Sequence, residues 1–144
     1  MKSLNILLIE DNEGDILLTT EAFEESKILN ILKVIKDGKA AIGFFEGLTD
    51  MNKLPDLVLL DINLPKKSGH EVLAYIKNAE QYRHIPVIML TTSSSEKDVM
   101  QAYKNYVNCY ITKPIDINDF IQAVVKIEDF WINIVSVPRN NAPS

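Results

Sequence analysis

The segment Leu57–Pro65 reads LVLLDINLP and decides the fold. Its first four residues are apolar without polar alternation, which is typical of a strand buried on both faces of a parallel sheet. Asp61 follows where the predicted strand ends. In open α/β sheets the ligand crevice lies outside the carboxyl ends of the strands, so an acid there is placed for chemistry. A single acid can also be a loop residue or a helix cap, and the other strand ends must decide between these interpretations.

The other predicted strands also end on polar side chains. The run Ile6–Ile9 precedes two acids, Pro86–Leu90 precedes a hydroxyl, and Val107–Ile111 precedes a threonine and a lysine; the residues that matter are Glu10, Asp11, Thr91 and Lys113. A further short strand is predicted over Ile31–Ile35. Because the carboxyl ends of parallel strands meet at one edge of a sheet, we expect the polar side chains to converge near Asp61.

Apolar residues at helical spacing predict a helix between each pair of strands and one after the last strand. The first helix is predicted from about Asn12 to Ser26, with an apolar face that includes Leu17. The pair Asp37-Gly38 is interpreted as a turn, and Thr49–Pro55 as a loop. Strands that alternate with helices in this way predict a doubly wound, five-stranded parallel sheet of the α/β class, because parallel neighbours need crossover connections.

The composition limits the classes of function. A chain of 144 residues with 47% hydrophobic content is expected to form one domain, placed at residues 1–137, with a flexible tail over residues 138–144. The net charge of -5 disfavours direct binding of nucleic acid, which needs a basic patch. The N-terminal apolar run is too short for a signal peptide or a membrane span, so we expect a cytoplasmic protein without membrane contact.

Soft metal ligands are few in this chain. Cys109 is the only cysteine, which excludes an intrachain disulfide and fits a reducing compartment. His70 and His84 lie far apart without the spacing of metal ligands, and we expect both on the surface. Any metal site is therefore expected to use oxygen ligands.

The predicted edge of the sheet suits a magnesium ion and a phosphoryl group. The carboxylates of Glu10, Asp11 and Asp61 would repel one another unless a cation lies among them, and Mg²⁺ prefers such hard oxygen ligands. A lysine and a hydroxyl, from Lys113 and Thr91, would then complete a site that neutralises a phosphoryl group. Each of these residues alone has a more ordinary explanation, as a surface lysine, a strand threonine or first-turn acids of a helix. Their combination at one edge favours phosphoryl chemistry.

At this point the chain resembles a response-regulator receiver domain. The resemblance rests on segments 7–12 (LLIEDN), 57–65 with Gly69, 86–91 (PVIMLT) and 110–114 (YITKP), and it covers roughly residues 4–130. It implies a flavodoxin-like three-layer sandwich with strand order 2-1-3-4-5. The receiver would include an extended C-terminal helix or arm.

The resemblance implies specific roles around a metal ion. Asp61 would accept a phosphoryl group from a histidine kinase or a phosphotransfer protein. Asp11, Asp61 and the backbone carbonyl of Asn63 would bind Mg²⁺ directly, and Glu10 would act through a water molecule. The protein would catalyse only its own phosphorylation and dephosphorylation, so it is not expected to be an enzyme with a separate substrate.

The resemblance also implies a switch. Lys113 would pair with a phosphoryl oxygen, and the peptide bond before Pro114 is usually cis in the family. Thr91 would turn its hydroxyl toward the phosphoryl group, and Tyr110 would then rotate inward. The side chain of Ser93 would border the path of the hydrolytic water, and because it is short we expect slow self-hydrolysis.

Two other functions stay open at this stage. The first is an aspartyl-phosphate phosphatase of the haloacid-dehalogenase type, which also uses a strand-terminal Asp, Mg²⁺ and a lysine. That family needs a second acid two residues after the nucleophile, where this chain has Asn63. The second is a receiver-like adaptor that binds its partners without phosphorylation.

The segment Phe130–Val135 is unusually apolar for the end of a receiver. It either folds back on its own domain or forms a homodimer seam, in which the contacts would come from Phe130, Trp131, Ile134 and Val135. A similar extension occurs in receivers that serve bacterial phytochrome kinases. The resemblance therefore implies a homodimer and a phytochrome kinase as partners.

Overall fold

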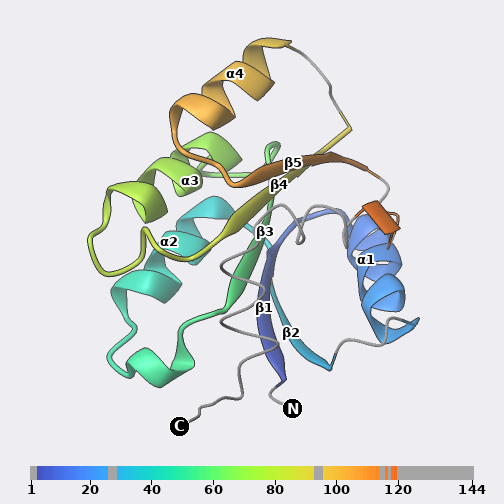
Figure 1. Ribbon diagram of the computed structural model, residues 1–144, viewed down its shortest axis with the longest axis horizontal. Helices are drawn as coiled ribbons and strands as arrows, with labels where there is room; N and C mark the ends of the chain where they lie inside the picture. The colour runs from blue at the N-terminus through green and yellow to red at the C-terminus, as the bar shows by residue number, and fades with distance from the viewer. Residues whose placement is uncertain (1–2, 26–28, 93–95, 114–115, 117, 120–144) are drawn as a thin grey trace, which may run out of the picture.

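Five parallel strands form one sheet in the order β2-β1-β3-β4-β5 (Figure 1). The computed structural model describes residues 3–25, 29–92, 96–113, 116 and 118–119. The strands are β1 (Leu4–Ile9), β2 (Asn30–Ile35), β3 (Leu57–Asp61), β4 (Val87–Thr91) and β5 (Cys109–Thr112). The predicted fold class and strand order are confirmed.

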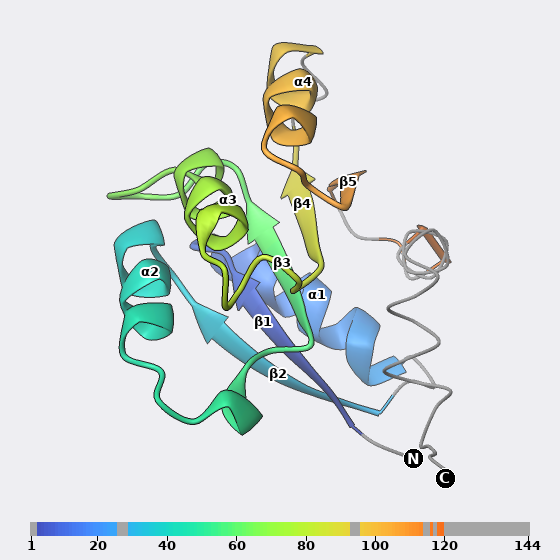
Figure 2. The ribbon, with the colours of Figure 1, turned by 60° about the vertical axis from the view of Figure 1, so that its left-hand side comes forward.

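Helices cover both faces of the sheet, α1 on one side and α2 and α3 on the other, whereas α4 lies beside α3 near β5 (Figures 1 and 2). The described helices are α1 (Glu13–Glu25), α2 (Gly38–Glu46), the 3-10 helix η1 (Met51–Lys53), α3 (Gly69–Asn78) and α4 (Glu96–Lys104). None of these helices is long and apolar enough to cross a membrane. Apart from residues 116 and 118–119, the predicted fifth helix and the tail fall outside the described residues.

The central strand β3 is buried on both faces, as the uninterrupted apolar run predicted. Val58 and Leu60 belong to the core under α2 and α3, and the alternate residues Leu57 and Leu59 belong to the core on the α1 side. All four are completely buried. Because a strand places successive side chains on opposite faces, this packing fixes the register of β3 and brings Asp61 to the edge of the sheet.

Two glycines let the loop after β3 pack closely against its neighbours. A Cβ atom at Gly69 would overlap the carbonyl oxygen of Asp61, and one at Gly38 would overlap the carbonyl oxygen of Lys67. The N–H of Gly69 donates a hydrogen bond to the carbonyl of Ile62 at 2.8 Å. The loop is thereby held against both the end of β3 and the start of α2.

The structure adds detail to two loop predictions. Asp37 in the predicted turn is the N-cap of α2, and its Oδ1 accepts a hydrogen bond from the N–H of Ala40 at 2.6 Å. The predicted loop Thr49–Pro55 contains the 3-10 turn η1, which begins after a second aspartate cap at Asp50. Aspartate favours both turns and caps because its short side chain accepts hydrogen bonds from nearby N–H groups, so the sequence alone did not separate them.

The predicted apolar face of the first helix also needs a correction. Leu17 is 59% exposed, whereas Thr19 and Phe23 are buried and Ile16 packs partly against the core. Residues 16, 19 and 23 recur at helical spacing, and Leu17 is rotated by about 100° from Ile16 on an α-helix. Its side chain therefore lies away from the face that contacts the sheet.

Replacing Gly69 tests the close approach of the loop. Gly69→Ala should lower the free energy of unfolding by about 2 to 3 kcal/mol, because the added methyl group meets rigid backbone. Gly43→Ala is the matched control, since a Cβ there has no atom within 4 Å and lies in the middle of α2. That variant should gain about 1 kcal/mol through helix propensity. Urea unfolding measures both, and an equal response of the two variants would contradict this packing.

Candidate functional site

Three carboxylates meet at the carboxyl edge of the sheet. Glu10 and Asp11 follow β1, and Asp61 ends β3; carboxylate oxygens of all three lie within 4.8 Å of one another. The two strands pair in parallel with Ile9 opposite Leu60, so the residues that come next lie side by side. Glu10 and Asp61 are buried, whereas Asp11 is exposed. The structure thus brings together the three acids that the sequence predicts at this edge of the sheet.

Lys113 lies among these acids as their counter-ion. Its Nζ is 2.6 Å from Oε1 of Glu10, 2.9 Å from Oδ2 of Asp15 and 3.3 Å from Oδ1 of Asp61. The side chain is only 8% exposed. The backbone N–H of Lys113 donates to the carbonyl of Thr91 at 2.7 Å, so the end of β4 holds the lysine in place.

The electrostatics of the site follow from burial. The pKa of the Glu10 carboxyl is raised to about 7, chiefly by burial; the hydrogen bond from Lys113 acts in the opposite direction, and the charge of Asp61 adds to the rise. Burial would lower the pKa of the Lys113 ammonium, but its hydrogen bonds to Glu10 and Asp15 and the charge of Asp61 hold that pKa above its usual value. The site therefore keeps a cation among buried acids, and the oxygen donors of Glu10, Asp11 and Asp61 fit Mg²⁺.

Asp15 belongs to the site, although its place in the sequence indicates only the first turn of the helix predicted from about Asn12 to Ser26. It lies in the first turn of α1, and its N–H donates to the side chain of Asn12 at 2.9 Å. Acids are common in first turns because they complement the helix dipole, so the residue type gave no separate signal. Only the packing of α1 beside the sheet edge shows that this side chain reaches Lys113.

Two hydroxyl groups connect the site to β5. Thr91 is completely buried at the end of β4, opposite Thr112 in the strand register. The side chain of Thr91 is hydrogen bonded to that of Tyr110, which is partly buried against the core. Burial raises the pKa of the Tyr110 hydroxyl, and the charge of Asp98 on α4 adds to the rise. A movement of the Thr91 hydroxyl would therefore change or break its hydrogen bond to Tyr110.

The expectation that His70 lies on the surface was wrong. His70 is 9% exposed, and its Nε2 lies 3.3 Å from Oδ1 of Asp98. The residue follows Gly69 in the first turn of α3, on the side that faces α4, so the helix pairing covers it. His84 is exposed, as predicted.

The remaining predicted site residues are placed as follows. Asn63 is exposed in the loop after β3, two residues beyond Asp61. The others lie outside the described residues; they are Ser93, Pro114, Phe130, Trp131, Ile134 and Val135. Their proposed roles stay predictions.

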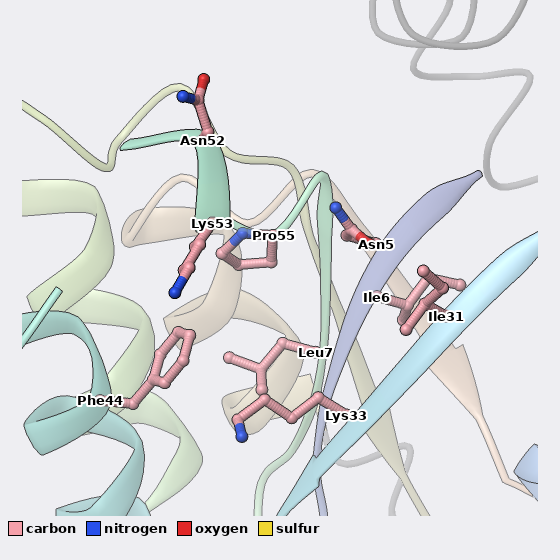
Figure 3. A pocket seen from close by; sticks show the side chains of 9 residues that line it. All are labelled: Asn5, Ile6, Leu7, Ile31, Lys33, Phe44, Asn52, Lys53 and Pro55. Atoms are coloured by element: carbon pink, nitrogen blue, oxygen red, sulfur yellow. The ribbon is translucent and has the colours of Figure 1, made fainter. Parts of the chain in front are cut away.

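A separate cavity of about 250 Å³ lies against the amino-terminal halves of β1 and β2 (Figure 3). Its lining comes from β1, β2, α2 and the segment around η1, and the Nζ of Lys33 lies 5.7 Å from the ring centroid of Phe44. None of the clustered carboxylates lines this cavity. It is therefore not part of the carboxylate site.

Removing the lysine tests its role as counter-ion. In EDTA, Lys113→Met should lower the free energy of unfolding by about 3 kcal/mol, because buried carboxylates are left without a cation. Urea unfolding provides the measurement. Lys36→Met is the control: Lys36 pairs with Glu13 at the surface, where ion pairs contribute little. Equal losses in the two variants would show that Lys113 is not a buried counter-ion.

Comparisons with known proteins agree with this geometry. Residues 6–125 match the family model of the response regulator receiver domain. Response regulator Rcp1 of Synechocystis sp. is 44% identical over 135 residues, 92% of each chain, and its Mn(2+)-bound crystal structure superposes with a TM-score of 0.73, at 42% identity over 95% of this chain and 99% of that one.

Two further proteins extend the comparison. The probable methanogenesis regulatory protein FilR2 of Methanothrix harundinacea is 43% identical over 130 residues, which is 88% of this chain and 83% of that protein. The phosphorylated cyanobacterial phytochrome response regulator RcpA superposes with a TM-score of 0.74 at 40% identity, over 95% of this chain and 99% of that one. Because the family model and these relatives span most of the sequence, the chain belongs to the response regulator receiver domain family.

Proposed function

We propose that this protein is a response regulator that accepts a phosphoryl group on Asp61 from a histidine kinase or a phosphotransfer protein. The observation that carries the proposal is the buried Asp61 carboxylate, which lies 3.3 Å from the Lys113 ammonium and within 4.8 Å of two further acids. In the reaction an oxygen of Asp61 forms a bond to phosphorus while the P–N bond of the donor phosphohistidine breaks. The leaving imidazole keeps the electron pair and takes up a proton from solvent.

Charge neutralisation is the main requirement of this transfer. Asp11, Asp61 and the carbonyl of Asn63 would hold Mg²⁺ directly and Glu10 through a water molecule; when bound, the ion neutralises phosphoryl oxygens. The Lys113 ammonium would pair with another phosphoryl oxygen. The Mn(2+)-bound form of Rcp1, a protein 42% identical in that structure, supports a divalent cation in a chain of this kind. Asp61 thus receives the phosphoryl group while cations balance the added charge.

Phosphorylation would be signalled through the pair Thr91 and Tyr110. Their hydrogen bond links the phosphoryl site to β5, and Tyr110 also lies close enough to Asp98 for that charge to affect its hydroxyl. If Thr91 turns toward the phosphoryl group, Tyr110 loses this partner and rotates inward. The surface made by α4 and β5 then changes, and with it the affinity for a partner.

The proposed partner is a kinase of the phytochrome type, because RcpA is a phytochrome response regulator at 40% identity. The similar identity to FilR2, a probable methanogenesis regulatory protein, supports a regulatory role outside phytochrome signalling equally well. We place the protein in the cytoplasm, where such a kinase would present its phosphohistidine. The protein is proposed to act only on itself, and turnover of free phosphate esters would instead favour a haloacid-dehalogenase-type phosphatase.

The first test is covalent phosphorylation. With acetyl phosphate and Mg²⁺, the intact mass should increase by one phosphoryl group, and the increase should be absent in Asp61→Asn, in Asp11→Ala and in EDTA. Mg²⁺ alone should raise the melting temperature of the wild type, since it binds only the folded state. Labelling that persists in Asp61→Asn would show that another residue is the acceptor and would refute the assignment.

The second test concerns the proposed homodimer, whose seam would include Phe130, Trp131, Ile134 and Val135. Sedimentation of the wild type should show a dimer that Trp131→Ala weakens, because the variant removes a large apolar contact. Phosphorylation should change the dimer affinity if the seam includes the surface near Tyr110. Monomers in every state would refute the dimer, and identical affinities with and without phosphorylation would refute the coupling.

A further inference from the structure

Asp15 contacts the lysine of the site but stands apart from the acids that could hold a metal. Its Oδ2 lies 2.9 Å from the Lys113 Nζ, and its side chain is 26% exposed. Within the described part of the chain, the group of acids close enough to share an ion consists of Glu10, Asp11 and Asp61. Asp15 is fixed by the first turn of α1, where Asn12 accepts a hydrogen bond from its backbone N–H.

The ammonium and a divalent cation would share two carboxylates. An ammonium has three N–H donors, and that of Lys113 is directed at three carboxylates, those of Glu10, Asp15 and Asp61. Two of these acids also belong to the group that could hold a metal. A cation that enters this group therefore binds carboxylates that Lys113 also contacts, whereas among the described residues Asp15 is the carboxylate partner of the lysine that lies outside the group.

We propose that Asp15 is a positioning residue that draws the Lys113 ammonium away from the metal ligands, so that Mg²⁺ can enter while the lysine stays within reach of Asp61. The inference rests on the Mg²⁺ site of the proposed function and adds a residue to it. In this arrangement Asp15 and Lys113 have opposite effects on the metal. Lys113 competes with Mg²⁺, and Asp15 reduces that competition.

The test is the affinity for Mg²⁺, measured by titrating MgCl2 at constant ionic strength and following amide NMR shifts of the folded protein. Asp15→Asn should weaken Mg²⁺ binding about fivefold, in the range of couplings between linked binding events. Lys113→Met should strengthen it, because a competing cation is removed. A purely structural ion pair would not give opposite signs, since loss of either partner would loosen the site in the same way.

The matched control is Glu13→Gln. Glu13 lies in the same first turn of α1 and also pairs with a lysine, but its partner Lys36 is outside the site. The variant removes the same charge from the same helix end. Its Mg²⁺ affinity should stay within about twofold of the wild type, because exposed charges at a distance are largely screened.

The double variant distinguishes two effects of Asp15: positioning of the Lys113 ammonium, and direct attraction of Mg²⁺ by its own charge. In the Lys113→Met background, Asp15→Asn should change log Kd for Mg²⁺ by less than half as much as it does in the wild type. The reason is that no ammonium is left to move. An undiminished effect in this background would show that Asp15 acts only through its own charge. In the wild-type background, an effect of Asp15→Asn no larger than that of Glu13→Gln would show that Asp15 does not act on the metal site at all. Either result overturns the inference.

The proposed function can fail separately. Absence of Mg²⁺ binding in the wild type itself would refute the metal site on which both proposals stand. Wild-type binding together with phosphorylation of Asp61, but without the opposite effects of Asp15→Asn and Lys113→Met, would refute only the role of Asp15. Urea unfolding in EDTA is measured in parallel. It ensures that Mg²⁺ affinities are compared only between variants that are folded.

Discussion

Burial of β3 on both faces is the constraint on which the rest of the structure depends. The side chains of Val58 and Leu60 fill one core, and those of Leu57 and Leu59 fill the other, so a shift of the strand by one residue would exchange the two sets. The uninterrupted apolar run of β3 ends at Leu60, and the last side chain of the strand is that of Asp61. The parallel partner β1 is paired with Ile9 opposite Leu60, which places the acids that follow β1 beside Asp61.

The convergence of acids brings several carboxylates close together, and a lysine compensates for their negative charge. Buried carboxylates need a cation, and Lys113 approaches from the end of β5 to supply it. The carboxylates of Glu10 and Asp61 also belong to the group that suits a divalent ion, so the lysine and a metal would share these two residues. Asp15, which reaches in from α1, gives the ammonium a partner outside that shared set. The charge balance of the site thus involves residues of the sheet edge and of one flanking helix.

The helix α4 is attached to the domain in a different way. Ala102 is its buried residue, whereas Met100 and Tyr103 are more than half exposed. Two polar interactions of Asp98 add to this small apolar contact. Its carboxylate lies beside the His70 ring, and its charge raises the pKa of the Tyr110 hydroxyl. A helix held by few apolar contacts can change position at a lower free-energy cost than one packed in the core.

The sequence by itself determined the parallel sheet, its central strand and the polar residues at the strand ends, because strand burial and the shared edge of parallel strands are expressed in short local patterns. It indicated neither Asp15 as a partner of Lys113 nor the burial of His70, because both depend on how α1 and α3 lie against distant parts of the chain. A first-turn acid and a lone histidine have the same local pattern whether they face solvent or a neighbour. Only the packing of helices against the sheet and against each other decides which of these side chains contacts another group.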